Sequence, residues 1–242
     1  MNSEIQAPAP EPVGEPVKYS VPWKPIDNWI ALLLLAVIYG GLLWLAVRGD
    51  RSRLAQSGLL VIVQLSFLLP IAIIFAWRRV SWRSIGFGKF NWGTLGIGCG
   101  LLIAGYAIIL LHNGILMLLG VKTQGEQISQ LFEGLKSPVW FFTVGAVLAP
   151  LVEEIFFRGF LFQGFRARYG WIPGLLLSSA IFGIAHLDPV ALIPTFILGC
   201  VLAFMYHRSN SIWPGVIFHV MINSVGLFVA YLATHYPNLI PS

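Results

Sequence analysis

The feature that most limits the fold of this chain is an uninterrupted apolar stretch, because residues 95–119 contain no Asp, Glu, Lys or Arg. A helix needs roughly 20 apolar residues to cross a hydrocarbon core of about 30 Å, so this stretch is long enough to span a bilayer. Charged residues make up 10% of the whole chain, against about 25% in an ordinary soluble domain. The sequence therefore predicts an integral membrane protein and argues against a soluble enzyme.

Similar apolar stretches recur along most of the sequence and predict an all-α, polytopic membrane helix bundle of about seven spans. The predicted spans are residues 28–47, 57–77, 94–119, 138–165, 172–187, 190–206 and 212–234. Residues 1–25 are rich in proline and poor in large apolar residues, so they are predicted to form a disordered tail. We expect residues 26–242 to form a single membrane-embedded domain, because no length is left for a second, water-soluble one.

The lysines and arginines predict how the bundle is oriented. If all seven stretches cross, nine of these residues lie on the side of the N-terminus and five on the other. The positive-inside rule then places the N-terminus in the cytoplasm and the C-terminus outside, although Arg48, Arg51 and Arg53 weigh against it. We expect a multi-pass protein of the cell membrane, the inner or plasma membrane in a prokaryote. Nucleic-acid binding is not expected, because the basic residues form no stripe interleaved with exposed aromatics.

The fifth predicted span, residues 172–187, is shorter than the others. Its roughly 16 residues reach only about 24 Å, less than the hydrocarbon thickness. It is therefore expected to be buried within the protein and to end near mid-membrane. With the predicted orientation, the polar residues described next would line a cavity that opens to the cytoplasmic side.

Two adjacent glutamates, Glu153 and Glu154, lie in the otherwise apolar fourth span, with Arg158 one turn further on. Ionisable groups inside membrane spans are costly and are functional candidates by default. Glu154 and Arg158 share a helix face, with the glutamate first, which is the better order for an ion pair. Glu153 points about 100° away. A structural pair that fixes the helix register would account for Glu154 and Arg158 but would leave Glu153 unexplained.

Three further polar residues lie in later spans: His186 near the end of the fifth, and His219 and Asn223 in the seventh. Taken alone, His186 is typical of a satisfied interfacial histidine, and the other two are typical of a hydrogen bond between helices. Together with Glu153, Glu154 and Arg158 they are nearly all the strongly polar side chains of the C-terminal spans, so we expect them to converge. A carboxylate can deprotonate water, and imidazole and amide donors can stabilise an oxyanion, so the set suits hydrolysis.

The polar residues form three short motifs in order along the chain: EExxxR at Glu153 to Arg158, FxxxH at Phe182 to His186, and HxxxN at His219 to Asn223. This pattern resembles the CAAX-processing and bacteriocin-processing intramembrane endopeptidases, also called the CPBP or Abi family. The resemblance covers about residues 138–225, the motif-bearing core. It implies an all-helical membrane protease that cuts peptides near the membrane surface. In eukaryotes, such proteases remove the last three residues of prenylated CAAX proteins.

The residues expected in the site are those of the three motifs: Glu153, Glu154, Arg158, His186, His219 and Asn223. Because Arg158 can neutralise Glu154, Glu153 is the freer carboxylate and the predicted general base. His186 is expected to help hold the attacking water, and His219 and Asn223 to donate to the oxyanion. The sequence thus predicts a glutamate-dependent endopeptidase without a cofactor, acting on a membrane-associated peptide or protein.

A metal-dependent version uses the same site, with zinc or another divalent ion bound by Glu153, His186 and His219 and an open position for water. The resemblance leaves this choice open, because the family has been described both as metalloproteases and as glutamate-dependent peptidases. Against the metal, no HExxH spacing places two histidine ligands on one helix. The metal-free version is therefore preferred.

The alternative from another class is a non-enzymatic membrane protein that uses the same polar pocket, either an immunity or scaffold protein or a proton-linked carrier. Intramembrane glutamate and histidine also form proton relays. A carrier commonly has two related halves, whereas here the polar residues are concentrated in the second half. Replacing Glu153 by glutamine would separate these classes, because a scaffold would tolerate the change and an enzyme would not.

Overall fold

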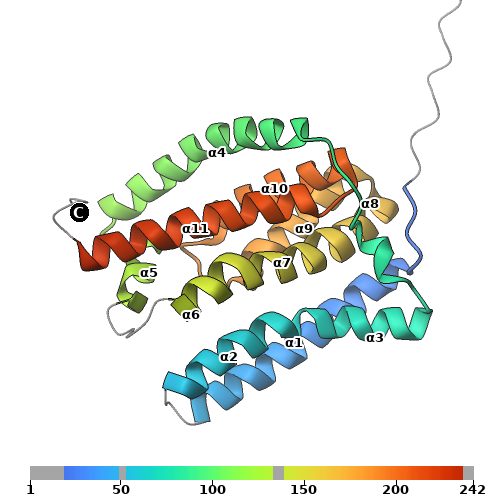
Figure 1. Ribbon diagram of the computed structural model, residues 1–242, viewed down its shortest axis with the longest axis horizontal. Helices are drawn as coiled ribbons and strands as arrows, with labels where there is room; N and C mark the ends of the chain where they lie inside the picture. Colours follow the sequence, from blue (N-terminus) through green and yellow to red (C-terminus); the bar gives the residue numbers. More distant parts are fainter. Residues whose placement is uncertain (1–18, 49–52, 133–138, 237–242) are drawn as a thin grey trace, which may run out of the picture.

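The computed structural model describes residues 19–48, 53–132 and 139–236, and within these ranges the chain is helical and forms no strand. The elements are α1 (Pro25–Arg48), α2 (Arg53–Ser66), α3 (Leu68–Arg78), η1 (Trp82–Ile85), α4 (Gly93–Leu118), α5 (Gln124–Phe132), α6 (Val139–Phe142), η2 (Thr143–Leu148), α7 (Ala149–Glu153), η3 (Glu154–Phe162), α8 (Gln163–Tyr169), α9 (Trp171–Ala185), α10 (Leu192–Ser209) and α11 (Trp213–His235). The long helices run roughly along one axis, with α1 to α3 at one edge of the bundle and α4 at the other (Figure 1).

The all-α membrane bundle predicted from the sequence is confirmed. Six helical segments are long and apolar enough to cross a membrane: Pro25–Leu45, Gly58–Arg78, Gly93–Leu118, Val139–Tyr169, Leu192–Ser209 and Trp213–His235. The remaining predicted span corresponds to α9, which has 15 residues and is therefore about 22 Å long. The fifth predicted span is thus as short as the sequence indicated. Of the seven predicted spans, six correspond to helical segments long enough to cross a membrane, and one corresponds to a short helix.

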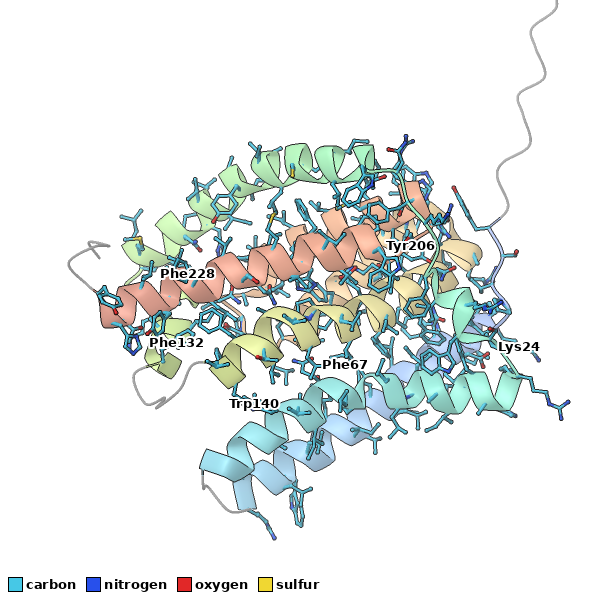
Figure 2. All side chains as sticks on the ribbon, viewed as in Figure 1. Lys24, Phe67, Phe132, Trp140, Tyr206 and Phe228 are labelled. Carbon is cyan, nitrogen blue, oxygen red and sulfur yellow. The ribbon has the colours of Figure 1, made fainter. Side chains whose placement is uncertain are left out.

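The polar segment between the predicted spans 94–119 and 138–165 contains a helix, α5, which the sequence did not predict. The helix lies against the end of α11, where the hydroxyl of Thr234 donates to the carbonyl of Ser129 at 3.0 Å. Phe132 is fully buried and its ring lies 5.8 Å from that of Tyr231, edge to face (Figure 2). Burial of this apolar face accounts for a helix in a segment too polar to span a membrane.

The second span is interrupted at Phe67, between α2 and α3. Pro70 has no N–H, so the carbonyl of Ser66 loses its usual helical donor and the chain turns there. Phe67 is buried and its ring lies 5.3 Å from Phe156 and 5.5 Å from Phe157. The interruption therefore directs an aromatic side chain from this span onto η3 (Figure 2).

The fourth span alternates between α-helix and π-helix. In η2, the N–H of Ala149 bonds to the carbonyl of Val144, five residues back. The next carbonyl, that of Gly145, would accept from residue 150 in this register, but residue 150 is proline and has no N–H. Gly145 is therefore left with a carbonyl that needs a partner from outside its own helix.

If all seven predicted spans cross, four segments of the chain lie on the same side as the N-terminus. In the structure these segments meet at one end of the bundle. Three contacts join them: Arg78 Nη2 to Asp27 Oδ1 at 2.8 Å, Arg166 Nη1 to Asn210 Oδ1 at 3.0 Å, and the N–H of Ile212 to the carbonyl of Gly86 at 2.9 Å. The predicted grouping of these loops is confirmed. That this end faces the cytoplasm stays a prediction.

The predicted tail lies mostly outside the described residues, since residues 1–18 are not among them, so its disorder stays a prediction. Its last residues are packed on the bundle. Trp23 is 3% exposed, stacks on Phe160 with 5.1 Å between ring centroids, and donates its indole N–H to Asn28 Oδ1 at 3.1 Å. The packed part of the chain therefore begins before residue 26.

Candidate active site

Glu154 is the centre of a buried polar cluster between η3 and α11. The residue is completely buried, as is nearly all of Arg158. Its Oε1 lies 2.8 Å from Arg158 Nη1 and 3.3 Å from His219 Nδ1, whereas its Oε2 has no hydrogen-bond partner among the described residues. The ion pair predicted from the i, i+4 spacing is therefore present, and its carboxylate also contacts the histidine of the third motif.

Glu153 lies beside this cluster and is less constrained. Its side chain is 10% exposed, and its Oε2 is 3.8 Å from His219 Nε2. That separation exceeds a hydrogen-bond distance. In the described part of the chain Glu153 forms no ion pair with a lysine or arginine. The two adjacent glutamates thus have different surroundings: Glu154 is paired with a guanidinium, and Glu153 is not.

His219 bridges the two glutamates with its two ring nitrogens. An ionised carboxylate only accepts hydrogen bonds, so Nδ1 carries the proton that faces Glu154. Nε2 is then the atom that faces Glu153. The imidazole is 2% exposed, and the ring of Phe182 packs against it edge to face at 5.8 Å. Its orientation is therefore fixed by a carboxylate on one side and an aromatic ring on another.

His186 lies at the end of α9 and is exposed. Its Nδ1 lies 2.8 Å from the carbonyl of Phe182. A carbonyl only accepts, so Nδ1 carries a proton and Nε2 is left free for another partner. His186 has no polar contact with the glutamates, and its link to the cluster is Phe182, whose ring lies 4.8 Å from His186 and 4.2 Å from the guanidinium of Arg158.

Asn223 occupies the same face of α11 as His219, as their spacing predicts, but its side chain has a different partner. Its Nδ2 donates to the carbonyl of Gly145 at 3.0 Å. This is the carbonyl that Pro150 and the π-helical register leave without a backbone donor. Asn223 therefore holds the helix that carries Glu153. An amide nitrogen has two N–H groups, so one is left for another acceptor.

The structure brings the predicted residues together to different degrees. Glu153, Glu154, Arg158 and His219 form one contact network. His186 joins it through Phe182, whereas Asn223 bonds to Gly145 of the same span as the glutamates. Among the described residues, no three or more His, Cys, Asp or Glu side chains are grouped so that they would hold a metal ion. The three ligands of the metal version therefore do not form a ligand set in this geometry.

One residue of the site carried no signal in the sequence. Gly215 of α11 packs against Glu154, and a Cβ at this position would overlap the carboxylate. This contact joins segments far apart in sequence, so no local spacing reveals it.

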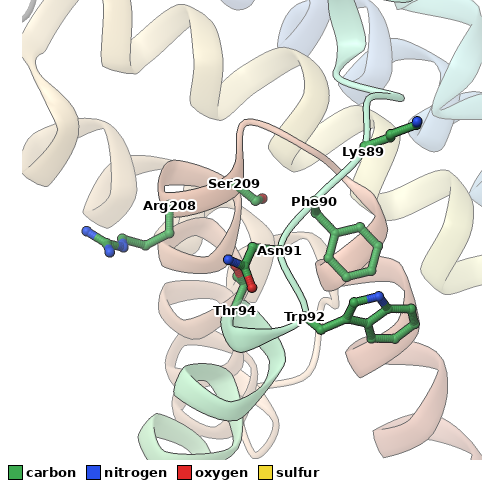
Figure 3. Close-up of a pocket in the computed structure, with 7 residues that line it drawn as sticks. All are labelled: Lys89, Phe90, Asn91, Trp92, Thr94, Arg208 and Ser209. Carbon is green, nitrogen blue, oxygen red and sulfur yellow. The ribbon is translucent and has the colours of Figure 1, made fainter.

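A separate hollow of about 490 Å³ lies where α4 begins and α10 ends. It is lined by Lys89, Phe90, Asn91, Trp92, Thr94, Arg208 and Ser209. None of the predicted site residues lines it. Its two cations, Lys89 and Arg208, extend away from each other (Figure 3), so they do not converge on one ligand.

Comparison with known proteins agrees with the motifs. A family model described as Rce1-like, type II CAAX prenyl endopeptidase, matches residues 135–225. A Bacillus subtilis (strain 168) protein named "Putative membrane peptidase YdiL" is 26% identical over 180 residues, 72% of this chain and 72% of its own length. An Escherichia coli protein named "Uncharacterized 24.3 kDa protein" is 34% identical over 86 residues, 34% of this chain and 40% of its own length. No solved structure matches the chain.

The matched range contains all three motifs, and the helices that carry them meet around one buried carboxylate. The chain is thus an integral, multi-pass membrane protein that is similar, over residues 135–225, to the Rce1-like type II CAAX prenyl endopeptidases.

Proposed function

We propose that the chain is a glutamate-dependent endopeptidase in which Glu153 activates water. The observation that carries this proposal is the unequal pairing of the two glutamates. Glu154 is neutralised by Arg158 at 2.8 Å, whereas Glu153 has no cationic partner other than His219, at 3.8 Å, among the described residues. A carboxylate that is not held by a strong partner is the better proton acceptor.

In the proposed reaction, Glu153 takes a proton from water while the water oxygen bonds to the peptide carbonyl carbon. The carbonyl oxygen becomes an oxyanion, which accepts hydrogen bonds from Nε2–H of His219 in its imidazolium form and from the second amide N–H of Asn223. Glu153 then passes the proton to the peptide nitrogen as the C–N bond breaks. Glu154 stabilises the imidazolium through Nδ1–H, in the manner of a carboxylate that orients a catalytic histidine.

His186 is proposed to hold the attacking water on the side of the site away from Glu154. The carbonyl of Phe182 keeps its Nδ1 protonated and leaves Nε2 as the free ring atom. His186 is also exposed, so it is the motif residue that an incoming peptide meets first. We propose membrane-associated peptides or proteins as substrates, consistent with the similarity to CAAX prenyl endopeptidases.

The test is cleavage by wild type against Glu153→Gln, measured by terminal proteomics of membranes that contain each protein. We expect new peptide termini with wild type and none with Glu153→Gln, while both proteins melt at similar temperatures. Asp188→Asn is the matched control, because it removes a carboxylate two residues beyond His186 yet keeps a side-chain oxygen for the N–H of Val190. Wild-type turnover by Glu153→Gln would refute the assignment of Glu153 as the base, whereas no cleavage by wild type would favour a scaffold.

A further inference from the structure

Gly215 has a specific relation to the buried carboxylate of Glu154. It precedes His219 by one helical turn on α11, so both residues face the same way. A Cβ built on Gly215 overlaps Oε2 of Glu154 and lies 3.2 Å from its Cδ. Oε2 is also the carboxylate oxygen without a hydrogen-bond partner among the described residues. The unpaired oxygen is thus accommodated against a backbone position that has no side chain.

Glu154 has little freedom to move away from an added methyl group. It is completely buried, and its other oxygen is held by Arg158 and His219. Arg158 is itself fixed, because its Nη2 donates to the carbonyl of Gly199 at 3.4 Å. Relieving the overlap to an ordinary contact requires a shift of about 1 Å, which would lengthen both contacts of Oε1.

We propose that Gly215 is a positioning residue of the peptidase site. Because Gly215 has no side chain, it leaves space for Oε2 and so determines the position of Glu154. Glu154 in turn determines the orientation of His219. This orientation determines the 3.8 Å separation between His219 Nε2 and Glu153 Oε2. This inference rests on the proposed function, since His219 and Glu153 act there on substrate and water. Gly215 touches neither of them in this role.

The test compares four proteins: wild type, Gly215→Ala, Glu154→Asp and the double variant. Aspartate is shorter by one methylene, so it withdraws the carboxylate from the added methyl group. We expect Gly215→Ala to lower kcat by about 100-fold, because a misplacement of about 1 Å in a catalytic site has an effect of this size. The double variant should recover at least about tenfold over Gly215→Ala, since residues in contact are coupled to this extent.

Gly226→Ala is the matched control, because it lies on the same helix and a Cβ there meets nothing within 4 Å. Its kcat should stay within about twofold of wild type. Wild-type activity in Gly215→Ala, or an equal loss in Gly226→Ala, overturns the proposal. A double variant no more active than the product of the single losses also overturns it, because simple helix packing at Gly215 would give no rescue by a shorter carboxylate.

Thermal unfolding of the same four proteins separates this inference from the proposed function. If wild type cleaves no peptide, the proposed function fails, while the melting temperatures still report on the contact between Gly215 and Glu154. Loss of stability in Gly215→Ala that Glu154→Asp partly restores supports the contact. Strictly additive melting shifts contradict it.

Discussion

Arg158 shows how this site separates stability from chemistry at the level of single residues. Its guanidinium is 2% exposed and pairs with Glu154, donates to a backbone carbonyl and lies over the ring of Phe182 at 4.2 Å. A buried charge without its partner is costly, whereas a buried pair is often close to neutral relative to well-packed uncharged residues. Arg158 and Glu154 are therefore expected to matter jointly for folding.

This reasoning predicts an asymmetric result for Arg158→Met. Alone, the substitution leaves Glu154 buried and uncompensated, and should lower the free energy of unfolding by about 3–5 kcal/mol. The double variant Glu154→Gln/Arg158→Met removes both charges and should recover much of that loss. Thermal unfolding in detergent provides the measurement. A double variant as unstable as Arg158→Met would mean that the charges are not the reason for the loss.

Metal dependence is a second question at the residue scale. We predict that protein dialysed against a chelator keeps its peptidase activity, and that added zinc does not increase it, because in the proposed reaction Glu153 alone activates the water. Turnover before and after dialysis, with zinc returned in steps, provides the measurement. Activity that disappears on chelation and returns in proportion to zinc would instead establish the metal version with Glu153, His186 and His219.

At the scale of elements, the link between η2 and α11 depends on a proline. Pro150 and the π-helical register leave the carbonyl of Gly145 without a backbone donor, and Asn223 supplies one at 3.0 Å. An unsatisfied buried carbonyl costs about 1–3 kcal/mol. The third motif is therefore attached to the helix of the first motif by a bond that ordinary α-helix would not require.

A double-mutant cycle tests this link. Asn223→Ala should destabilise the protein by about 1–3 kcal/mol in the wild-type background. In a Pro150→Ala background the loss should be smaller, since the alanine introduced there restores an N–H that can satisfy the Gly145 carbonyl. Activity should stay low in both backgrounds, because the proposed oxyanion donor is absent from both. Equal destabilisation in the two backgrounds would show that Asn223 does not act through this carbonyl.

The sequence predicts long apolar helices well and their internal register poorly. The predicted spans 94–119 and 212–234 correspond closely to α4 and α11. They were predictable because the apolar composition of a segment decides whether it can lie in lipid. The helix α5 was missed because its stability comes from packing of Phe132 and not from an apolar run. The π-helical segments were missed because hydropathy carries no information on which carbonyl each N–H reaches.

The candidate site was predictable where it depends on local spacing. The four-residue spacing of Glu154 and Arg158 indicated the ion pair that the structure contains. The sequence predicted only that His219 and the glutamates converge. Which glutamate faces Nδ1 and which faces Nε2 depends on how α11 packs on the fourth span. The close approach of Gly215 to Glu154 was not predictable, since it depends on an absent side chain.

At the scale of the whole molecule, the loops that the predicted topology places on the side of the N-terminus lie together at one end of the bundle. Arg166 connects two of them, because it donates to Asn210 and lies 4.3 Å from the ring of Tyr19. The loop from Arg79 to Trp92 also reaches this end, where the hydroxyl of Ser211 donates to a carbonyl within it, at 2.7 Å. The excess of positive charge is therefore concentrated at one surface.

Labelling of single cysteines in intact cells tests which surface this is. With Cys99 and Cys200 replaced by alanine, a cysteine at Tyr169, which is 45% exposed, should be protected from an impermeant reagent. A cysteine at Ser242 should be labelled. The positive-inside rule is the reason, since Arg166 and Arg168 flank the first position. Labelling at residue 169 from outside would invert the orientation and the side from which the proposed cavity opens.

The short length of α9 raises the question of whether the chain crosses the bundle an odd or an even number of times. Six long spans counted by hydropathy form an even number, and an even number of crossings returns both chain ends to the same compartment. Yet α9 and α10 together leave one end of the bundle and return to it, as the bond from Arg166 to Asn210 requires. α1 consequently starts, and α11 finishes, at opposite ends of the molecule (Figure 1). A reporter fused to each terminus should therefore give opposite signals, even though one of the seven helices is too short to cross.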